Sequence, residues 1–103
     1  MKINDIDFSC SLEDILNELV RQLRLNNIPY IQKMMPTHSD IQISCPYHKG
    51  GLERRPSAGV RRSDGLFHCL ACGETHSIQE VIGHCFGEDE VAASFGWRWL
   101  LKN

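Results

Sequence analysis

Two short motifs constrain this chain more than any other feature. The first runs from Cys45 to His48 and the second from Cys69 to Cys72, with two residues between the potential ligands of each. Two side chains at that spacing reach one ion from a single tight turn, so the motifs together supply the four ligands of a closed tetrahedral shell. Twenty residues separate the motifs, which leaves room for a hairpin. The pattern predicts one structural Zn²⁺ bound by all four residues, and an iron–sulfur cluster is the alternative.

Length and cysteine content support a metal-stabilised domain. A chain of 103 residues predicts one domain with little stability in reserve, and metal binding would add to its folding free energy. The acidic first residues do not resemble a signal peptide, and no apolar stretch is long enough for a transmembrane helix. We therefore expect a cytoplasmic protein without membrane contact, in which cysteines bind metal rather than form disulfides. Cys10 and Cys85 are expected to be free thiols.

A helix is predicted from Ser11 to Asn26. Apolar residues recur there at the spacing of one helix face, and Ser11 with Asp14 forms a potential capping box at its start. Residues 1–10 are expected to be a polar lead-in. Residues 30–39 are expected to be an irregular connection or a short strand.

The region around the motifs has the pattern of a small sheet. Alternating polar and apolar residues indicate a strand at 40–44. A hairpin of strands 57–62 and 66–68 is expected around a turn at 63–65, and it leads into the second motif. The glycine- and charge-rich segment 49–56 is expected to be a mobile loop.

Helices are expected after the second motif. Ser77 and Glu80 form a capping box for a helix that ends near Phe86, and Gly73 suits a turn with positive φ. A further helical stretch begins at the acidic residues from Glu88. The residues expected to face inward on it are Val91, Ala92, Phe95 and Trp99.

These elements together predict an α+β fold. A small antiparallel zinc ribbon would be flanked by an N-terminal helix and by C-terminal helices. We expect residues 1–39 to form the N-terminal helix and connection. Residues 40–103 would form the zinc-ribbon domain with its C-terminal helices.

Positive charge concentrates between the two motifs, although the net charge of the chain is −2. Arginines on a rigid sheet suit phosphate contacts, and exposed rings can stack on bases. We therefore predict a nucleic-acid surface, for which a solvated, charged sheet edge is the alternative. Its predicted backbone contacts are Lys49, Arg54, Arg55, Arg61 and Arg62, and its predicted base contacts are Phe67, His68 and Tyr47.

No set of residues in the chain suits catalysis. No Cys–His pair is free of the predicted metal site, and no glycine loop precedes a Lys-Ser or Lys-Thr pair. The acidic residues lie mainly on predicted helix faces, where they do not converge on a magnesium ion. We therefore predict no catalytic residue and no enzymatic activity for this chain alone.

The residues around the ligands resemble the N-terminal zinc-binding domain of bacterial and phage DNA primases. The likeness rests on the Cys-Pro-Tyr-His motif, on Pro56-Ser57 followed by Val60, and on the run from Phe67 to Gly73 with a helix after it. The segment from Cys85 to Leu100 is similar to phage-type primases.

The resemblance implies a function in DNA replication, within the primosome of a bacterium or a phage-infected cell. The zinc domain would recognise the template initiation sequence in single-stranded DNA. A separate TOPRIM-type catalytic domain, in cis or in trans, would perform the nucleotidyl transfer of this DNA-directed RNA polymerase, and a replicative helicase is a further expected partner.

Two other functions are compatible with the same residues. A zinc-stapled interaction module would dock a helicase or polymerase through its acidic helix faces and apolar C-terminal stretch. A zinc-ribbon transcription regulator would prefer duplex DNA.

Overall fold

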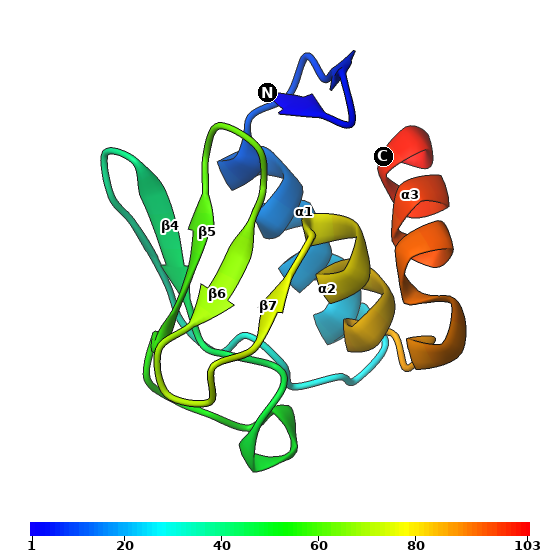
Figure 1. Cartoon of the computed structure of the whole chain (residues 1–103). Helices are drawn as coiled ribbons and strands as arrows, with labels where there is room; N and C mark the ends of the chain where they lie inside the picture. The colour runs from blue at the N-terminus through cyan, green and yellow to red at the C-terminus, as the bar shows by residue number, and fades with distance from the viewer.

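The computed structural model, which describes residues 1–103, consists of a five-stranded antiparallel sheet, a small N-terminal hairpin and three helices (Figure 1). The α+β class predicted from the sequence is confirmed. The sheet strands are β3 (Met34–Pro36), β4 (Asp40–Ile43), β5 (Ala58–Arg61), β6 (Phe67–Cys69) and β7 (Thr75–His76). The helices are α1 (Leu12–Leu25), α2 (Ile78–Cys85) and α3 (Ala92–Lys102), with short 3₁₀ turns η1 (Lys49–Gly51) and η2 (Asp89–Val91).

The sheet is a meander in which each strand pairs with its neighbours in sequence, in the order β3-β4-β5-β6-β7. The three strands predicted around the motifs are present. The region 30–39 contains β3, which confirms the short-strand alternative, and the edge strand β7 was not predicted. Alternation along the strands buries one face of the sheet, because successive side chains point to opposite sides. That face carries Ile41, Ile43, Val60 and Phe67, all with 0% exposure.

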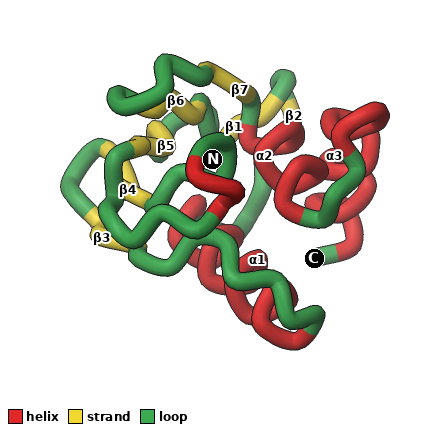
Figure 2. The backbone as a smooth tube through the Cα atoms, turned by 90° about the horizontal axis from the view of Figure 1, so that it is seen from below, coloured by secondary structure: helices red, strands yellow, loops and turns green.

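The helices lie on the buried side of the sheet (Figures 1 and 2). α1 has the predicted capping box, in which the Ser11 hydroxyl accepts from the Asp14 amide and the Asp14 carboxylate accepts from the Ser11 amide. α2 has the same arrangement with Ser77 and Glu80. Both helix starts predicted from the sequence are confirmed, because a capping box satisfies backbone N–H groups that lack intrahelical partners.

α3 packs on α2 through two glycines that permit backbone contact. A Cβ atom added at Gly96 would lie 1.9 Å from the carbonyl oxygen of Gln79, and one at Gly83 would lie 2.3 Å from that of Ala92. α3 is also tied to α1, because the Trp99 indole donates to the side-chain oxygen of Gln22 at 2.8 Å.

The start of α3 differs from the sequence prediction. Val91 was expected to face inward, but it lies in η2 at the start of the helical stretch and is 47% exposed. Ala92 and Phe95 are half-buried and Trp99 is buried.

Residues 2–7 form a hairpin, where the sequence predicted a polar lead-in over residues 1–10. β1 (Lys2–Ile3) pairs with β2 (Ile6–Asp7) across a turn in which Asn4 and Asp5 have φ of 50° and 65°. Asn and Asp tolerate this left-handed conformation better than most residues, which suits a two-residue hairpin turn. Ile3 is buried in the main core, and the Phe8 ring meets the Trp97 ring edge-on at 5.9 Å between centroids.

One core spans the boundary predicted between residues 39 and 40. The same buried cluster contains Leu16 of α1, Ile41 of β4 and Ile82 of α2, and β3 pairs with β4 across that boundary. Residues 1–39 and 40–103 are therefore packed as one unit. None of the helices combines the length and apolar composition that crossing a membrane requires.

Candidate metal centre

The four predicted ligands meet at one end of the sheet. Cys45 follows β4, His48 precedes η1, Cys69 ends β6 and Cys72 lies in the turn to β7. Their nearest ligand atoms all lie within 4.8 Å of one another. The Sγ atoms of Cys45 and Cys72 are 3.8 Å apart, and the Sγ of Cys69 lies 3.9 Å from Nδ1 of His48. Three thiols and one imidazole in this arrangement fit a four-coordinate metal ion.

Backbone groups in both motifs support the sulfur atoms. The Tyr47 amide donates to the Sγ of Cys45 at 3.3 Å, and the amides of Ala71 and Cys72 donate to that of Cys69. The Gly73 amide closes the second turn by donating to the Cys69 carbonyl at 2.9 Å, and Gly73 has the predicted positive φ of 79°. The N–H groups aimed at sulfur favour the thiolate form, which is the form that binds metal.

Two of the thiols differ in electrostatic environment. Burial raises the pKa of Cys45. Burial also acts to raise the pKa of Cys69, but hydrogen bonds from the Ser57 hydroxyl and from the backbone of the second motif lower it to about 7. Of these two thiols, Cys69 is the one more easily converted to a thiolate near neutral pH.

A buried carboxylate lies behind the cluster. Glu53 is only 4% exposed and accepts hydrogen bonds from the Cys45 amide at 2.9 Å, from the Ser57 hydroxyl at 2.7 Å and from Nε2 of His48 at 2.5 Å. Burial alone would raise its pKa, but these hydrogen bonds outweigh burial, and its pKa lies below the usual value. No sequence motif marks Glu53 as part of a metal site. The one sequence feature that sets Glu53 apart is that it is the single acidic residue among the basic residues of segment 49–56.

The histidines outside the cluster serve other contacts. The Tyr47 ring is stacked between the rings of His76 and His84, each with centroids 4.1 Å away. Nε2 of His84 donates to the carbonyl oxygen of Pro46 at 2.8 Å. These contacts support the first motif from β7, through His76, and from α2, through His84. They also occupy both faces of Tyr47, so the prediction that Tyr47 stacks on a base is wrong for this structure.

The predicted base-contact residues of β6 lie on opposite sides of the sheet. Phe67 has 0% exposure and points into the core, so its predicted contact with bases is corrected. Strand alternation gives the reason, because Phe67 shares the inner face with the ligand Cys69. His68 is exposed on the outer face, where its Nδ1 lies 2.8 Å from the Thr75 hydroxyl.

The five basic residues predicted to contact backbone phosphates fall into two groups. The first group is exposed without an ion pair: Lys49, Arg54 and Arg55. The second group is engaged by acids, since Arg61 pairs with Asp64 and Arg62 reaches Glu13 at 3.3 Å. Arg62 also donates to the Thr37 carbonyl. The first group therefore holds the basic side chains that are free to meet an anionic ligand.

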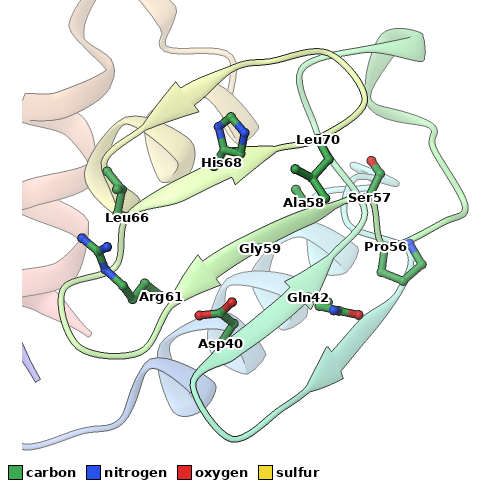
Figure 3. A pocket seen from close by; sticks show the side chains of 10 residues that line it. All are labelled: Asp40, Gln42, Pro56, Ser57, Ala58, Gly59, Arg61, Leu66, His68 and Leu70. Carbon is green, nitrogen blue, oxygen red and sulfur yellow. The ribbon is translucent and has the colours of Figure 1, made fainter.

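A pocket of about 310 Å³ lies on the exposed face of the sheet (Figure 3). Gly59 is at its centre on β5, with Gln42 of β4 and His68 of β6 directly opposite it in register. The absence of a side chain at Gly59 leaves a shallow floor between the two polar neighbours. The full lining is Asp40, Gln42, Pro56, Ser57, Ala58, Gly59, Arg61, Leu66, His68 and Leu70.

The pocket adjoins the cluster of predicted ligands. Ser57 lines the pocket, donates to Glu53, and lies 3.4 Å from the Sγ of Cys69. Leu70 lies between the ligands Cys69 and Cys72 and is 86% exposed at the pocket's edge. One end of the pocket therefore borders the cluster.

The remaining two cysteines stay outside the cluster, and all five are unpaired. Cys85 is buried in α2 and Cys10 is half-buried. No protein-family model, curated protein or solved structure shows significant similarity to the chain.

Proposed function

We propose that this chain is a zinc-stapled domain that recognises a single-stranded DNA template for a DNA primase. The observation that carries the proposal is the pocket on the exposed sheet face, which shares Ser57 and Leu70 with the surroundings of the ligand cluster. In this proposal the metal holds the sheet end rigid and the sheet face reads the strand. The resemblance of both motifs to primase zinc-binding domains supports the same assignment.

Zinc is the metal that we propose for the cluster. Three sulfurs and one imidazole nitrogen match the ligands that Zn²⁺ prefers in closed structural sites. Four protein ligands leave no coordination position for a substrate, so the metal would stabilise the fold and not activate water. The four residues are Cys45, His48, Cys69 and Cys72, and their sheet strands would form the zinc ribbon.

The sheet face has the features that single-strand binding needs. Gln42 and His68 offer hydrogen-bonding groups on either side of Gly59, where an unpaired base has room to lie against the sheet. Pro56 and Ser57 line one end of the pocket, so Arg54 and Arg55 directly precede its wall in sequence. Cations beside a shallow face suit the sugar–phosphate backbone of a flexible strand.

The primase assignment defines the partners of the proposal. A TOPRIM-type catalytic domain, in cis or in trans, would synthesise the primer, and a replicative helicase would be a second partner. Such an assembly acts in the cytoplasm of a bacterium or of a phage-infected host cell.

A direct binding measurement tests the proposal. Arg54 and Arg55 would be changed to Glu together, and the matched control would change Arg98 and Lys102 of α3 to Glu. Fluorescence anisotropy with a labelled single-stranded oligonucleotide at low salt should show a loss of affinity of about tenfold or more in the first variant only. Equal affinities for both variants and the parent chain would contradict the DNA surface.

A protein-docking function is the second candidate, and the same sheet face supplies its support. Leu70 is 86% exposed and Leu66 39% exposed at the pocket, and Met35 on β3 is 51% exposed in the same row as Gln42. Exposed apolar residues on one face suit a protein partner. Met35→Ser separates the two functions, because Met35 lies outside the pocket lining. The change should weaken capture of a helicase or primase catalytic domain while single-strand affinity changes less than twofold.

A further inference from the structure

His48 presents its two ring nitrogens to different partners. Nδ1 faces the sulfur atoms, at 3.9 Å from the Sγ of Cys69, and Nε2 meets the Glu53 carboxylate at 2.5 Å. A carboxylate accepts hydrogen bonds and cannot donate one when ionised, so Nε2 carries the proton. The lone pair that remains for a metal is then on Nδ1.

We propose that Glu53 is the positioning residue of the metal centre. It fixes His48 as an Nδ1 ligand, and it links metal binding to the order of the loop 49–56. A histidine that binds metal through one ring nitrogen commonly donates a hydrogen bond from the other ring N–H to a carboxylate. This bond fixes the ring orientation and raises the basicity of the ligand. Here the carboxylate belongs to the same loop that carries the free basic side chains.

The contacts of Glu53 tie together three ligand positions. Its oxygens accept from the Cys45 amide and from Nε2 of His48. They also accept from the Ser57 hydroxyl, which lies 3.4 Å from the Sγ of Cys69. A carboxylate with 4% exposure must have its acceptors satisfied, because a buried unpaired charge is strongly unfavourable. Moving any one of these donors therefore disturbs the other two.

The loop has a second anchor that fixes its direction. Gly51 is buried with φ of 78°, and a Cβ atom placed there would lie 2.2 Å from the Tyr30 ring. The Gly51 amide donates to the His48 carbonyl at 3.0 Å. Gly51 and Glu53 are the two anchored positions of the loop. Arg54 and Arg55 come directly after them in sequence, so their backbone position depends on Glu53 remaining in place.

The inference predicts that metal loading orders the loop before any nucleic acid is present. Without the metal, His48 loses its partner on the Nδ1 side, and the Glu53 bond alone must hold the turn. Contact between this loop and DNA rests on the proposed function. Metal affinity and loop order can be measured without DNA, so their outcome is independent of whether the chain binds DNA.

Nuclear magnetic resonance of the full chain loaded with Zn²⁺ tests the coordination mode without any substitution. The ¹⁵N shifts of His48 should show a metal-bound Nδ1 and a protonated Nε2, with the Nε2 proton exchanging slowly with water. A metal-bound Nε2 would overturn the proposal.

Glu53→Gln tests the positioning role. The amide keeps the size of the side chain but has one acceptor oxygen, so one of the three donors loses its partner. Competition with a chelator should show Zn²⁺ affinity reduced by about 10- to 100-fold, and hydrogen exchange should show lost protection in residues 49–56. The control is Glu90→Gln, an exposed acid without an ion pair, which should leave both measurements unchanged. Affinity and protection within twofold of the parent chain in Glu53→Gln would overturn the proposal.

Ser57→Ala distinguishes a local effect on the metal site from a general loss of folding. It removes one donor to Glu53 and keeps the carboxylate, so the loss of affinity should be smaller than in Glu53→Gln. Protection in α2 should stay unchanged in both variants if the fold is intact. Loss of α2 protection in Ser57→Ala together with loss of loop protection would show a general folding defect and would contradict a local positioning role.

Discussion

Cys72 is the most accessible of the four clustered residues. Cys45 and Cys69 have 0% exposure, whereas Cys72 lies on the exposed turn before β7. A chelator or oxidant therefore meets the Cys72 sulfur first, and the other two sulfurs are screened by the sheet. The order in which ligands are lost should follow this difference in exposure.

Cys72→Ser should empty the metal site without removing core volume. The variant loses one thiolate, so its metal affinity should fall by more than the roughly 10- to 100-fold that loss of an outer partner causes. Its thermal unfolding temperature should fall to that of the chelator-treated parent chain, because metal binding contributes to folding. Elemental analysis and circular dichroism measure the two effects.

Cys10→Ser is the matched control for this substitution. Cys10 is a free thiol outside the cluster, so metal content and its response to chelator should equal those of the parent chain. Equal metal content in the two variants would remove Cys72 from the ligand set.

The ligands could be found from the sequence, but their carboxylate partner could not. Two residues between ligands is a local rule, and it holds wherever the motif lies in a fold. Glu53 reaches His48 only because η1 turns the chain back, and no spacing rule marks it. The burial of Phe67 is predictable from the sequence, because residues two apart in a strand lie on the same face and Cys69 is two residues after Phe67.

At the scale of elements, the contact between α2 and α3 depends on a glycine. Helix propensity alone predicts that Gly96→Ala stabilises α3 by up to about 1 kcal/mol. The added methyl group would overlap the Gln79 carbonyl, so we expect a net loss of about 1–3 kcal/mol in the free energy of unfolding. Urea denaturation measures the sign. Arg98→Ala, an exposed change on the same helix, should alter stability by less than about 0.5 kcal/mol.

The capping box of α2 gives a prediction with a pH dependence. Ser77→Ala should cost about 1 kcal/mol at pH 7. The pKa of Glu80 is lowered from 4.5, first by the hydrogen bond from the Ser77 amide. A carboxylate with a lowered pKa stabilises the fold above its unfolded pKa, and this contribution is lost as the pH falls through the lowered value.

The pH effect is measured by comparing the parent chain with Glu80→Gln. The difference in their unfolding free energies should be largest at pH 7 and should shrink below about pH 4.5. A difference that stays constant across this range would show that the Glu80 charge does not contribute to the cap.

Helix starts were predictable because their signals are local. Ser11 with Asp14, and Ser77 with Glu80, form their bonds within one turn. The hairpin of β1 and β2 was missed because it is held by distant partners, as the Phe8–Trp97 contact shows. Strand β7 has two residues, too few for an alternating pattern.

At the scale of the whole molecule, charge limits how strongly a nucleic acid can bind. The chain has a net charge of −2, and the basic residues of segment 49–56, all exposed without an ion pair, are Lys49, Arg54 and Arg55. For single strands, affinity falls with salt by a slope of about 0.7 per neutralised phosphate on a log–log plot. Three contacts predict a slope of about −2 in anisotropy titrations over a range of salt concentrations.

This slope separates the two candidate functions. A slope near zero for the parent chain would indicate that the basic loop makes no phosphate contacts, which favours the protein-docking function. A slope reduced by the Arg54 and Arg55 charge reversal, but not by the Arg98 and Lys102 control, supports the DNA surface.

The length of the chain predicts one domain, but the patterns of its segments do not identify the contacts that join them. Residues 1–39 have a clear helix pattern of their own, yet their apolar side chains share a core with the sheet. A pattern shows that a face will be buried, but it does not identify the surface that covers it. That assignment required the fold.

The meander also has a kinetic consequence. Every sheet strand pairs with its sequence neighbour, so loops close over short spans and little chain entropy is lost at each step. The bonds from Gln22 to Trp99 and to Asn103 instead join residues 77 and 81 positions apart. Low contact order favours fast folding. We therefore expect the strands and the ligand cluster to assemble first, and the attachment of α3 to α1 to be the late step that refolding experiments detect through tryptophan fluorescence.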